Sequence, residues 1–122
     1  MTRAVVKCTI AFLLLSTFAA ALHADVVSIT TRITRTMVVS DDRWGGCAAQ
    51  LSVSPADEGL PNCGKWVTFS CTGVHTTKSR ALVMFDQAQM AFALDRRVRV
   101  FVDDSKTHNG ICFVNRIELL AP

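Results

Sequence analysis

The sequence predicts a small, mainly β domain that contains one helix and is held by two disulfides. Five segments have the alternating or β-branched pattern of strands, and one amphipathic segment lies between the third and the fourth. Four cysteines follow the N-terminal leader. The chain has 122 residues, which is enough for one domain.

The leader, residues 1–24, has the pattern of a secretory signal peptide. Arg3 and Lys7 form a basic start, residues 10–21 are almost wholly apolar, and small residues end the segment at Ala24. We expect cleavage after Ala24, with Ala21 as the alternative. The protein is therefore expected in the periplasm or outside the cell.

Cleavage leaves a single domain, residues 25–122, with little net charge. Loss of Arg3 and Lys7 reduces the 13 basic residues to 11, against 10 acidic residues, which is a net charge of about +1. A nucleic-acid partner needs a concentrated basic surface and is not expected. No second apolar stretch has spanning length, so the exported domain is not expected to cross a membrane.

The cysteines of the exported domain are Cys47, Cys63, Cys71 and Cys112, since Cys8 belongs to the signal. An even number in a small exported domain favours two disulfides. Zinc is the competing use, but no CxxC pair is present, and the cysteine spacings do not resemble a zinc ribbon. No metal or cofactor site is predicted.

The strands are expected at residues 26–39, 47–53, 64–72, 98–103 and 111–119. In the first, Val27, Ile29, Ile33, Met37 and Val39 share one parity and predict the core face. The length of this strand suggests a bend or bulge near 31–35. Residues 104–110 are expected to form a turn, because Asn109-Gly110 is a strong hairpin signal.

The helix is expected over residues 80–94, with Thr76 or Thr77 as its N-cap. Its apolar residues recur at three- and four-residue steps and define one face: Ala81, Met84, Phe85, Ala88, Ala91 and Phe92. Further apolar residues extend beyond that face: Leu82, Val83, Met90, Ala93 and Leu94. A helix that is apolar on more than one side favours a homo-oligomer that covers it.

The element order β-β-β-α-β-β is that of the OB-fold, a small Greek-key barrel. The alternative is an α+β sandwich in which the helix lies along an open sheet. An antiparallel hairpin of the second and third strands would place three pairs on one face: Cys47 with Cys71, Ala49 with Phe69, and Leu51 with Val67. Cys63 would then pair with Cys112, although four cysteines allow two other connectivities.

Two loops hold the candidate ligand-binding residues, which are Trp44, Asp103, Asp104, Lys106, His108 and Asn109. An exposed indole stacks on the apolar face of a sugar or anchors a protein partner, and the polar loop offers hydrogen bonds. In an OB barrel these two loops flank the usual ligand face. The alternatives are that Trp44 packs on the barrel mouth and that residues 103–109 form only a solvated turn.

Catalysis is not expected. His75 and His108 suggest it, but a cysteine nucleophile needs a free thiolate, and all four cysteines are better explained as bridged. The sequence contains no serine-nucleophile elbow, metalloprotease helix or phosphate loop.

Several motifs between residues 47 and 102 resemble a known family. They are a cysteine in the second strand, a cysteine closing the third, Asp86-Gln87-Ala88 in the helix and Val98-Arg99-Val100 in the next strand. This pattern resembles the B subunits of bacterial toxins of the subtilase-cytotoxin and pertussis-like type. The resemblance implies an OB-fold, a pentameric ring and binding to cell-surface glycans. The alternative is another family of small exported proteins with the same barrel.

The sequence thus predicts a small exported binding protein that recognises a glycan or protein ligand, with a ring-forming, toxin-like subunit as one form of it. The alternative is a monomeric periplasmic protein with a structural or inhibitory role.

Overall fold

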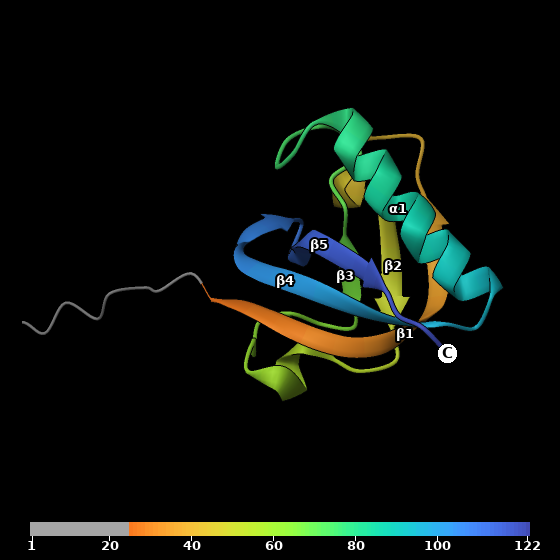
Figure 1. Ribbon diagram of the computed structural model, residues 1–122. Coiled ribbons are helices and arrows are strands. Elements are labelled where there is room, and N and C mark those ends of the chain that lie inside the picture. The colour runs from red at the N-terminus through yellow and green to blue at the C-terminus, as the bar shows by residue number, and fades with distance from the viewer. Residues whose placement is uncertain (1–24) are drawn as a thin grey trace, which may run out of the picture.

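The computed structural model describes residues 25–122 (Figure 1). The predicted signal peptide, with Cys8 and His23, lies outside the described residues. The elements are β1 (Val26–Val38), β2 (Cys47–Leu51), β3 (Trp66–Thr68), α1 (Lys78–Ala93), β4 (Arg97–His108) and β5 (Ile111–Leu119). Two short 3-10 turns, η1 (Arg43–Gly45) and η2 (Pro55–Glu58), follow β1 and β2. The predicted order β-β-β-α-β-β is confirmed.

The five strands form a closed barrel in the order β1-β2-β3-β5-β4, which excludes the open-sheet alternative. β3 and β5 pair in parallel, and every other neighbouring pair is antiparallel. Helix α1 lies across one side of the barrel (Figure 1). The architecture is therefore OB-fold-like, as the sequence predicts.

The helix begins where its cap predicts. The Thr77 hydroxyl accepts a hydrogen bond from the Arg80 N–H at 3.3 Å. The face turned to the barrel buries Ala81, Phe85, Ala88 and Ala91. Phe92 was expected on this face but is 49% exposed, although its neighbour Ala91 is buried in the core.

A bulge in β1 changes which side chains face the core. The register shifts between Ile33 and Arg35, as expected for this part of the strand. Ile29 and Ile33 lie in the core before the shift. Beyond it, Thr36 pairs with the core residue Ala49, so Met37 lies on the outer face. The prediction that Met37 faces the core is therefore wrong.

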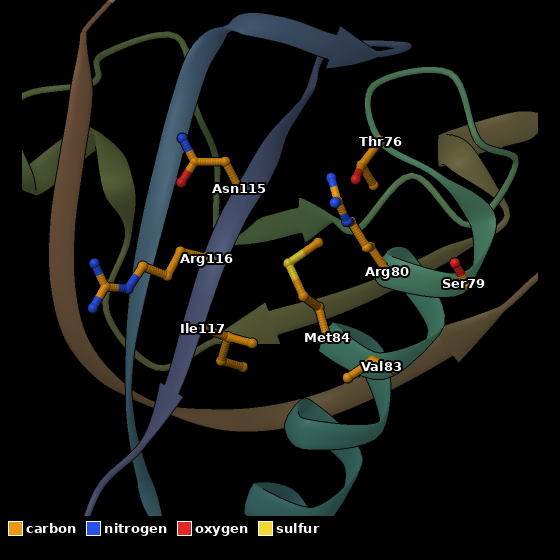
Figure 2. Close-up of a pocket in the computed structure, with 8 residues that line it drawn as sticks. All are labelled: Thr76, Ser79, Arg80, Val83, Met84, Asn115, Arg116 and Ile117. Atoms are coloured by element: carbon orange, nitrogen blue, oxygen red, sulfur yellow. The ribbon is translucent and has the colours of Figure 1, made fainter.

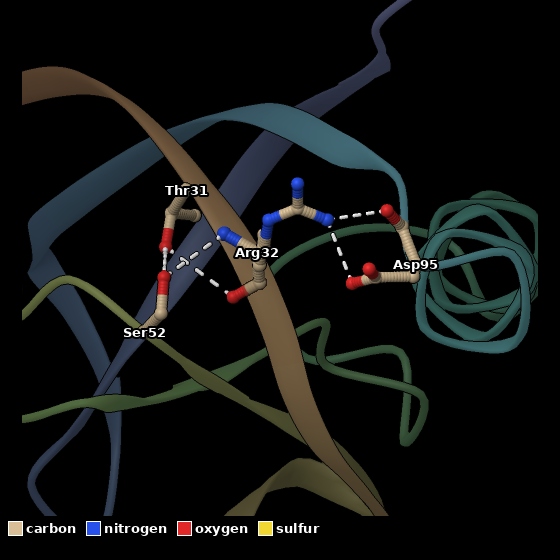
Figure 3. A network of polar contacts seen from close by, with 4 residues as sticks. All are labelled: Thr31, Arg32, Ser52 and Asp95. Atoms are coloured by element: carbon tan, nitrogen blue, oxygen red, sulfur yellow. Dashed lines mark hydrogen bonds and ion pairs between the residues drawn. The ribbon is translucent and has the colours of Figure 1, made fainter. Parts of the chain in front are cut away.

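A polar network fastens β1 to its surroundings (Figure 3). The buried Thr31 hydroxyl lies 3.0 Å from Ser52 Oγ and accepts the Val53 N–H, which satisfies a polar group on the core side of β1. Arg32, on the wet side, places Nη1 2.7 Å from Asp95 Oδ1 just after α1. This contact links the first strand to the end of the helix.

Both predicted disulfides are confirmed. Cys47 joins Cys71 and Cys63 joins Cys112, each with its Cα atoms 5.6 Å apart. The predicted strand register is wrong by two residues, because Ala49 faces Val67. The even shift keeps Val67 and Phe69 on their predicted core face. Cys71 lies beyond the end of β3 and still reaches Cys47.

The third strand is shorter than expected. It ends at Thr68, whose hydroxyl accepts the N–H of Ser70, and Ser70 then adopts a left-handed conformation with φ of 60°. This local hydrogen bond competes with strand pairing and ends the regular ladder with β2. The chain stays beside β2, because the Thr72 N–H bonds the Gly45 carbonyl and Cys71 joins Cys47.

The fourth strand is longer than expected. Pairing with β5 is interrupted after Asp103 and resumes at Thr107, so residues 104–106 bulge from the ladder. Only Asn109 and Gly110 form the turn, with positive φ at both positions. The prediction of a turn over residues 104–110 is corrected to a strand with a bulge and a two-residue turn.

Candidate functional site: a tryptophan hollow beside a histidine cluster

The first loop, which joins β1 to β2 and includes η1, packs against the β4–β5 hairpin. Gly45 has φ of 76°, and a Cβ atom there would lie 2.7 Å from Cδ2 of His108. Only glycine fits this approach without displacing the imidazole. The backbone carbonyl of the preceding residue, Trp44, accepts a hydrogen bond from the Thr68 hydroxyl at 2.7 Å. This bond connects the same loop to β3. The first loop and the hairpin therefore lie side by side.

The two tryptophans of the chain meet at this point. Trp44 and Trp66 are both half-buried, and together with Met37 and Ile111 they line a hollow of about 270 Å³. Trp44 comes from the first loop, Trp66 from β3, Met37 from β1 and Ile111 from the start of β5. The β1 bulge is what directs Met37 into the hollow.

Two guanidinium groups flank the hollow. Arg35 lies 5.8 Å from the centre of the Trp66 ring, and Arg43 lies 5.6 Å from that of Trp44. Arg43 also forms an ion pair with Asp41 at 2.7 Å, which lowers the pKa of the Asp41 carboxyl. The hollow thus combines an apolar floor with cations on its rim.

Three of the predicted polar ligands make contacts within the protein. Asp103 is buried and accepts hydrogen bonds from the N–H and hydroxyl of Ser105. Lys106 lies 3.7 Å from Asp103 Oδ2 and 5.9 Å from the centre of the Phe113 ring. Asp104 accepts the backbone N–H of Asp25. The structure does not place Asp103 or Asp104 among the residues that line the hollow.

His108 and Asn109 differ in their surroundings. Asn109 is exposed at the hairpin tip. His108 faces inward, with Nε2 2.9 Å from the hydroxyl of Ser70. The same hydroxyl accepts the backbone N–H of His75 at 3.0 Å, and the rings of His75 and His108 are 4.6 Å apart. The sequence does not predict that the two histidines lie in contact, because they come from different elements and no sequence periodicity relates them.

This cluster contains a serine beside a histidine, but the serine is fully buried. A nucleophile must reach its substrate, so we assign the Ser70 hydroxyl a role in holding the loops. Residues 25–122 contain no group of three His, Cys, Asp or Glu side chains arranged to hold a metal ion. They also contain no helix long and apolar enough to cross a membrane.

A second depression, of about 500 Å³, lies between α1 and β5 (Figure 2). Arg80 and Met84 project into it from the helix, and Ile117 from the strand. The guanidinium of Arg116 points away from the helix, pairs with Glu118 and lies 4.8 Å from the centre of the Phe101 ring. The groove is wide and open and has Arg80 as its main cation.

The outer side of α1 is apolar, as the sequence predicts. Leu82, Val83, Met90 and Leu94 are each about half exposed or more. This outer helix face, formed by those four residues, lies opposite the barrel.

No family model, curated protein or solved structure matches the chain. The fold and the geometry of the site therefore carry the functional argument.

Proposed function

We propose that the chain is a small exported recognition protein and that the tryptophan hollow is its contact site. One observation carries the proposal: both tryptophans of the chain, from separate elements, converge on an open hollow instead of the core. Half-buried aromatic side chains in a depression are typical of the anchors that dominate binding energy.

The composition of the hollow favours a protein ligand over a glycan. Its lining residues are Met37, Trp44, Trp66 and Ile111, none of which carries a hydrogen-bonding group other than the indole N–H. Sugar hydroxyls need paired partners, and the carboxylates expected to supply them, Asp103 and Asp104, are engaged elsewhere. An apolar or aromatic side chain of a partner needs no such groups.

The rim adds a preference for acidic neighbours in the ligand. Arg35 is exposed beside Trp66, so a carboxylate flanking an apolar anchor would meet its guanidinium group. Arg43, beside Trp44, is already paired with Asp41. The proposed ligand is thus an apolar side chain set among acidic residues. A glycan ligand is the second outcome of the test.

Two further features support export and assembly. The disulfides are typical of exported proteins, which supports a periplasmic or secreted location. The outer helix face supports self-association, and a ring of toxin-like subunits is one form it could take. The alternative remains a monomeric periplasmic protein with an inhibitory or structural role, which would use the same hollow.

Array binding tests the proposal. Nine-residue peptides with a central Phe, Trp, Leu or Ile between Asp and Glu residues would be screened alongside a glycan array. We expect peptide binding that Trp66→Ala abolishes and Phe92→Ala preserves, since Phe92 is an exposed aromatic outside the hollow. Glycan binding lost in Trp66→Ala would keep the site and change the ligand class. Binding that Trp66→Ala leaves intact would contradict the site.

A further inference from the structure

Two segments far apart in the chain meet at one buried hydroxyl group, and a third segment packs against the histidine of one of them. Ser70 Oγ lies 2.9 Å from Nε2 of His108 on β4 and accepts the N–H of His75 at 3.0 Å. His75 Nε2 lies 3.1 Å from the carbonyl oxygen of Thr107. Gly45 of the first loop packs against the same edge of the His108 ring, where a Cβ atom would lie 3.0 Å from Nε2. The cluster therefore joins the β4–β5 hairpin, the loop before α1 and the loop that holds Trp44.

We assign the proton positions from the donor and acceptor groups present, taking His108 as the tautomer that accepts at Nε2. Because Ser70 Oγ already accepts from His75, its hydroxyl hydrogen is free to be donated to His108 Nε2. That bond requires an unprotonated Nε2 and hence a neutral His108. His75 must donate from Nε2, because the Thr107 carbonyl only accepts. At neutral pH all these bonds are satisfied together.

We propose that the Ser70–His75–His108 cluster is an acid-sensitive latch that controls the shape of the tryptophan hollow. Protonation of His108 replaces the acceptor at Nε2 by a donor, so the Ser70 hydroxyl hydrogen loses its partner. The cation also lies 4.6 Å, ring to ring, from His75. The hairpin then separates from Gly45, and the adjacent Trp44 moves relative to Ile111.

The charged groups around His108 act in opposite directions. Burial lowers the pKa of His108 below its ordinary value of 6.5, and the neighbouring His75 lowers it further, whereas Asp42 of the first loop opposes both. On its own strand, Lys106 and Asp103 pair with each other. In the first loop Arg43 pairs with Asp41. The net direction is toward the neutral imidazole.

The sign of the pH dependence follows from that direction. A histidine whose pKa is lower in the folded than in the unfolded state binds fewer protons when folded. Its contribution to stability is complete above pH 6.5 and is lost as the pH falls below that value toward the folded-state pKa. Acid therefore releases the latch, and neutral pH closes it.

Tryptophan fluorescence tests the latch, because both tryptophans of the chain line the hollow. Between pH 7.5 and 5 we expect a reversible change in emission with a midpoint below 6.5. His108→Gln should abolish it, because the Gln side-chain oxygen still accepts from Ser70 but does not titrate. A transition that persists in His108→Gln, or a midpoint at or above 6.5 in the parent, would overturn the proposal.

Two further variants should shift the midpoint of the transition in opposite directions, which a cluster with only a structural role would not do. His75→Gln removes the neighbouring positive charge and should raise the midpoint, while Asp42→Asn removes the opposing carboxylate and should lower it. If His108→Gln does not fold, these midpoint shifts and the imidazole titration of His108 by NMR test the latch instead. Midpoints unmoved in both variants would overturn the latch.

Discussion

The backbone N–H of Asp25 donates a hydrogen bond to the carboxylate of Asp104, with 3.1 Å between N and Oδ1. With the expected cleavage after Ala24, this nitrogen becomes the α-ammonium group of the exported protein. The bond then becomes an ion pair between the start of β1 and the bulge of β4.

We therefore expect Asp104→Asn to lower the free energy of unfolding of the processed protein by about 0.5 kcal/mol, the scale of an exposed ion pair. Urea denaturation measures it, with Asp57→Asn on the exposed turn η2 as the control. Acetylation of the N-terminus should reduce the difference between parent and Asp104→Asn, because the amide N–H keeps its hydrogen bond but loses the charge. A difference that acetylation leaves unchanged would contradict the ion pair.

Gly45→Ala should be among the most destabilising changes outside the core. The new methyl group would lie against His108 and Thr68, on a backbone with positive φ. Strain of this kind costs about 1–3 kcal/mol. Gly59→Ala is the matched control, because Gly59 also has positive φ, of 102°, but a Cβ there has nothing within 4 Å. Equal urea midpoints for the two variants would show that the first loop does not press on the hairpin.

The Cys63–Cys112 disulfide should contribute more to stability than Cys47–Cys71, because it closes a longer loop. The sequence separations are 49 and 24 residues. Chain entropy then gives about 4.1 and about 3.4 kcal/mol, respectively. Denaturation of the two double Cys→Ala variants compares them. A larger loss from the Cys47–Cys71 variant would point to native-state packing instead of loop closure.

The outer helix face should mediate self-association. Met90 is 46% exposed in the monomer, and a charge placed there would be buried and unpaired in an interface. We expect an oligomer by light scattering at micromolar concentration, dissociated by Met90→Glu and unaffected by Gln89→Glu on the neighbouring exposed position. A parent that stays monomeric at all these concentrations would favour the monomeric alternative.

Much of the fold was predictable because local patterns and global topology agree. The cap at Thr77, the Asn109-Gly110 turn and the β-branched strands each carry a local signal. The predicted cysteine pairing is right, although the predicted register is wrong by two residues and Cys71 lies beyond the end of β3.

The site was less predictable, because it depends on departures from regular pairing. One bulge sends Met37 outward, and another turns the expected loop around Asp103 into internal hydrogen bonds. The sequence identified Trp44 and His108 but not the neighbours that each would meet. Those neighbours are Trp66, at the start of β3, and Ser70, two residues beyond its end. The strand is shorter than its pattern suggests.

The two indole N–H signals in a ¹H–¹⁵N NMR spectrum test the recognition hypothesis most directly, because the chain has only two tryptophans. An array-selected peptide with a central Phe among Glu residues would be titrated into the labelled protein at pH 7.5. We predict that both indole signals shift with one common dissociation constant, and that replacing the central Phe by Ala abolishes the shifts. Peptide binding that moves backbone signals of α1 or β5 while both indole signals stay in place would contradict the hollow as the contact site.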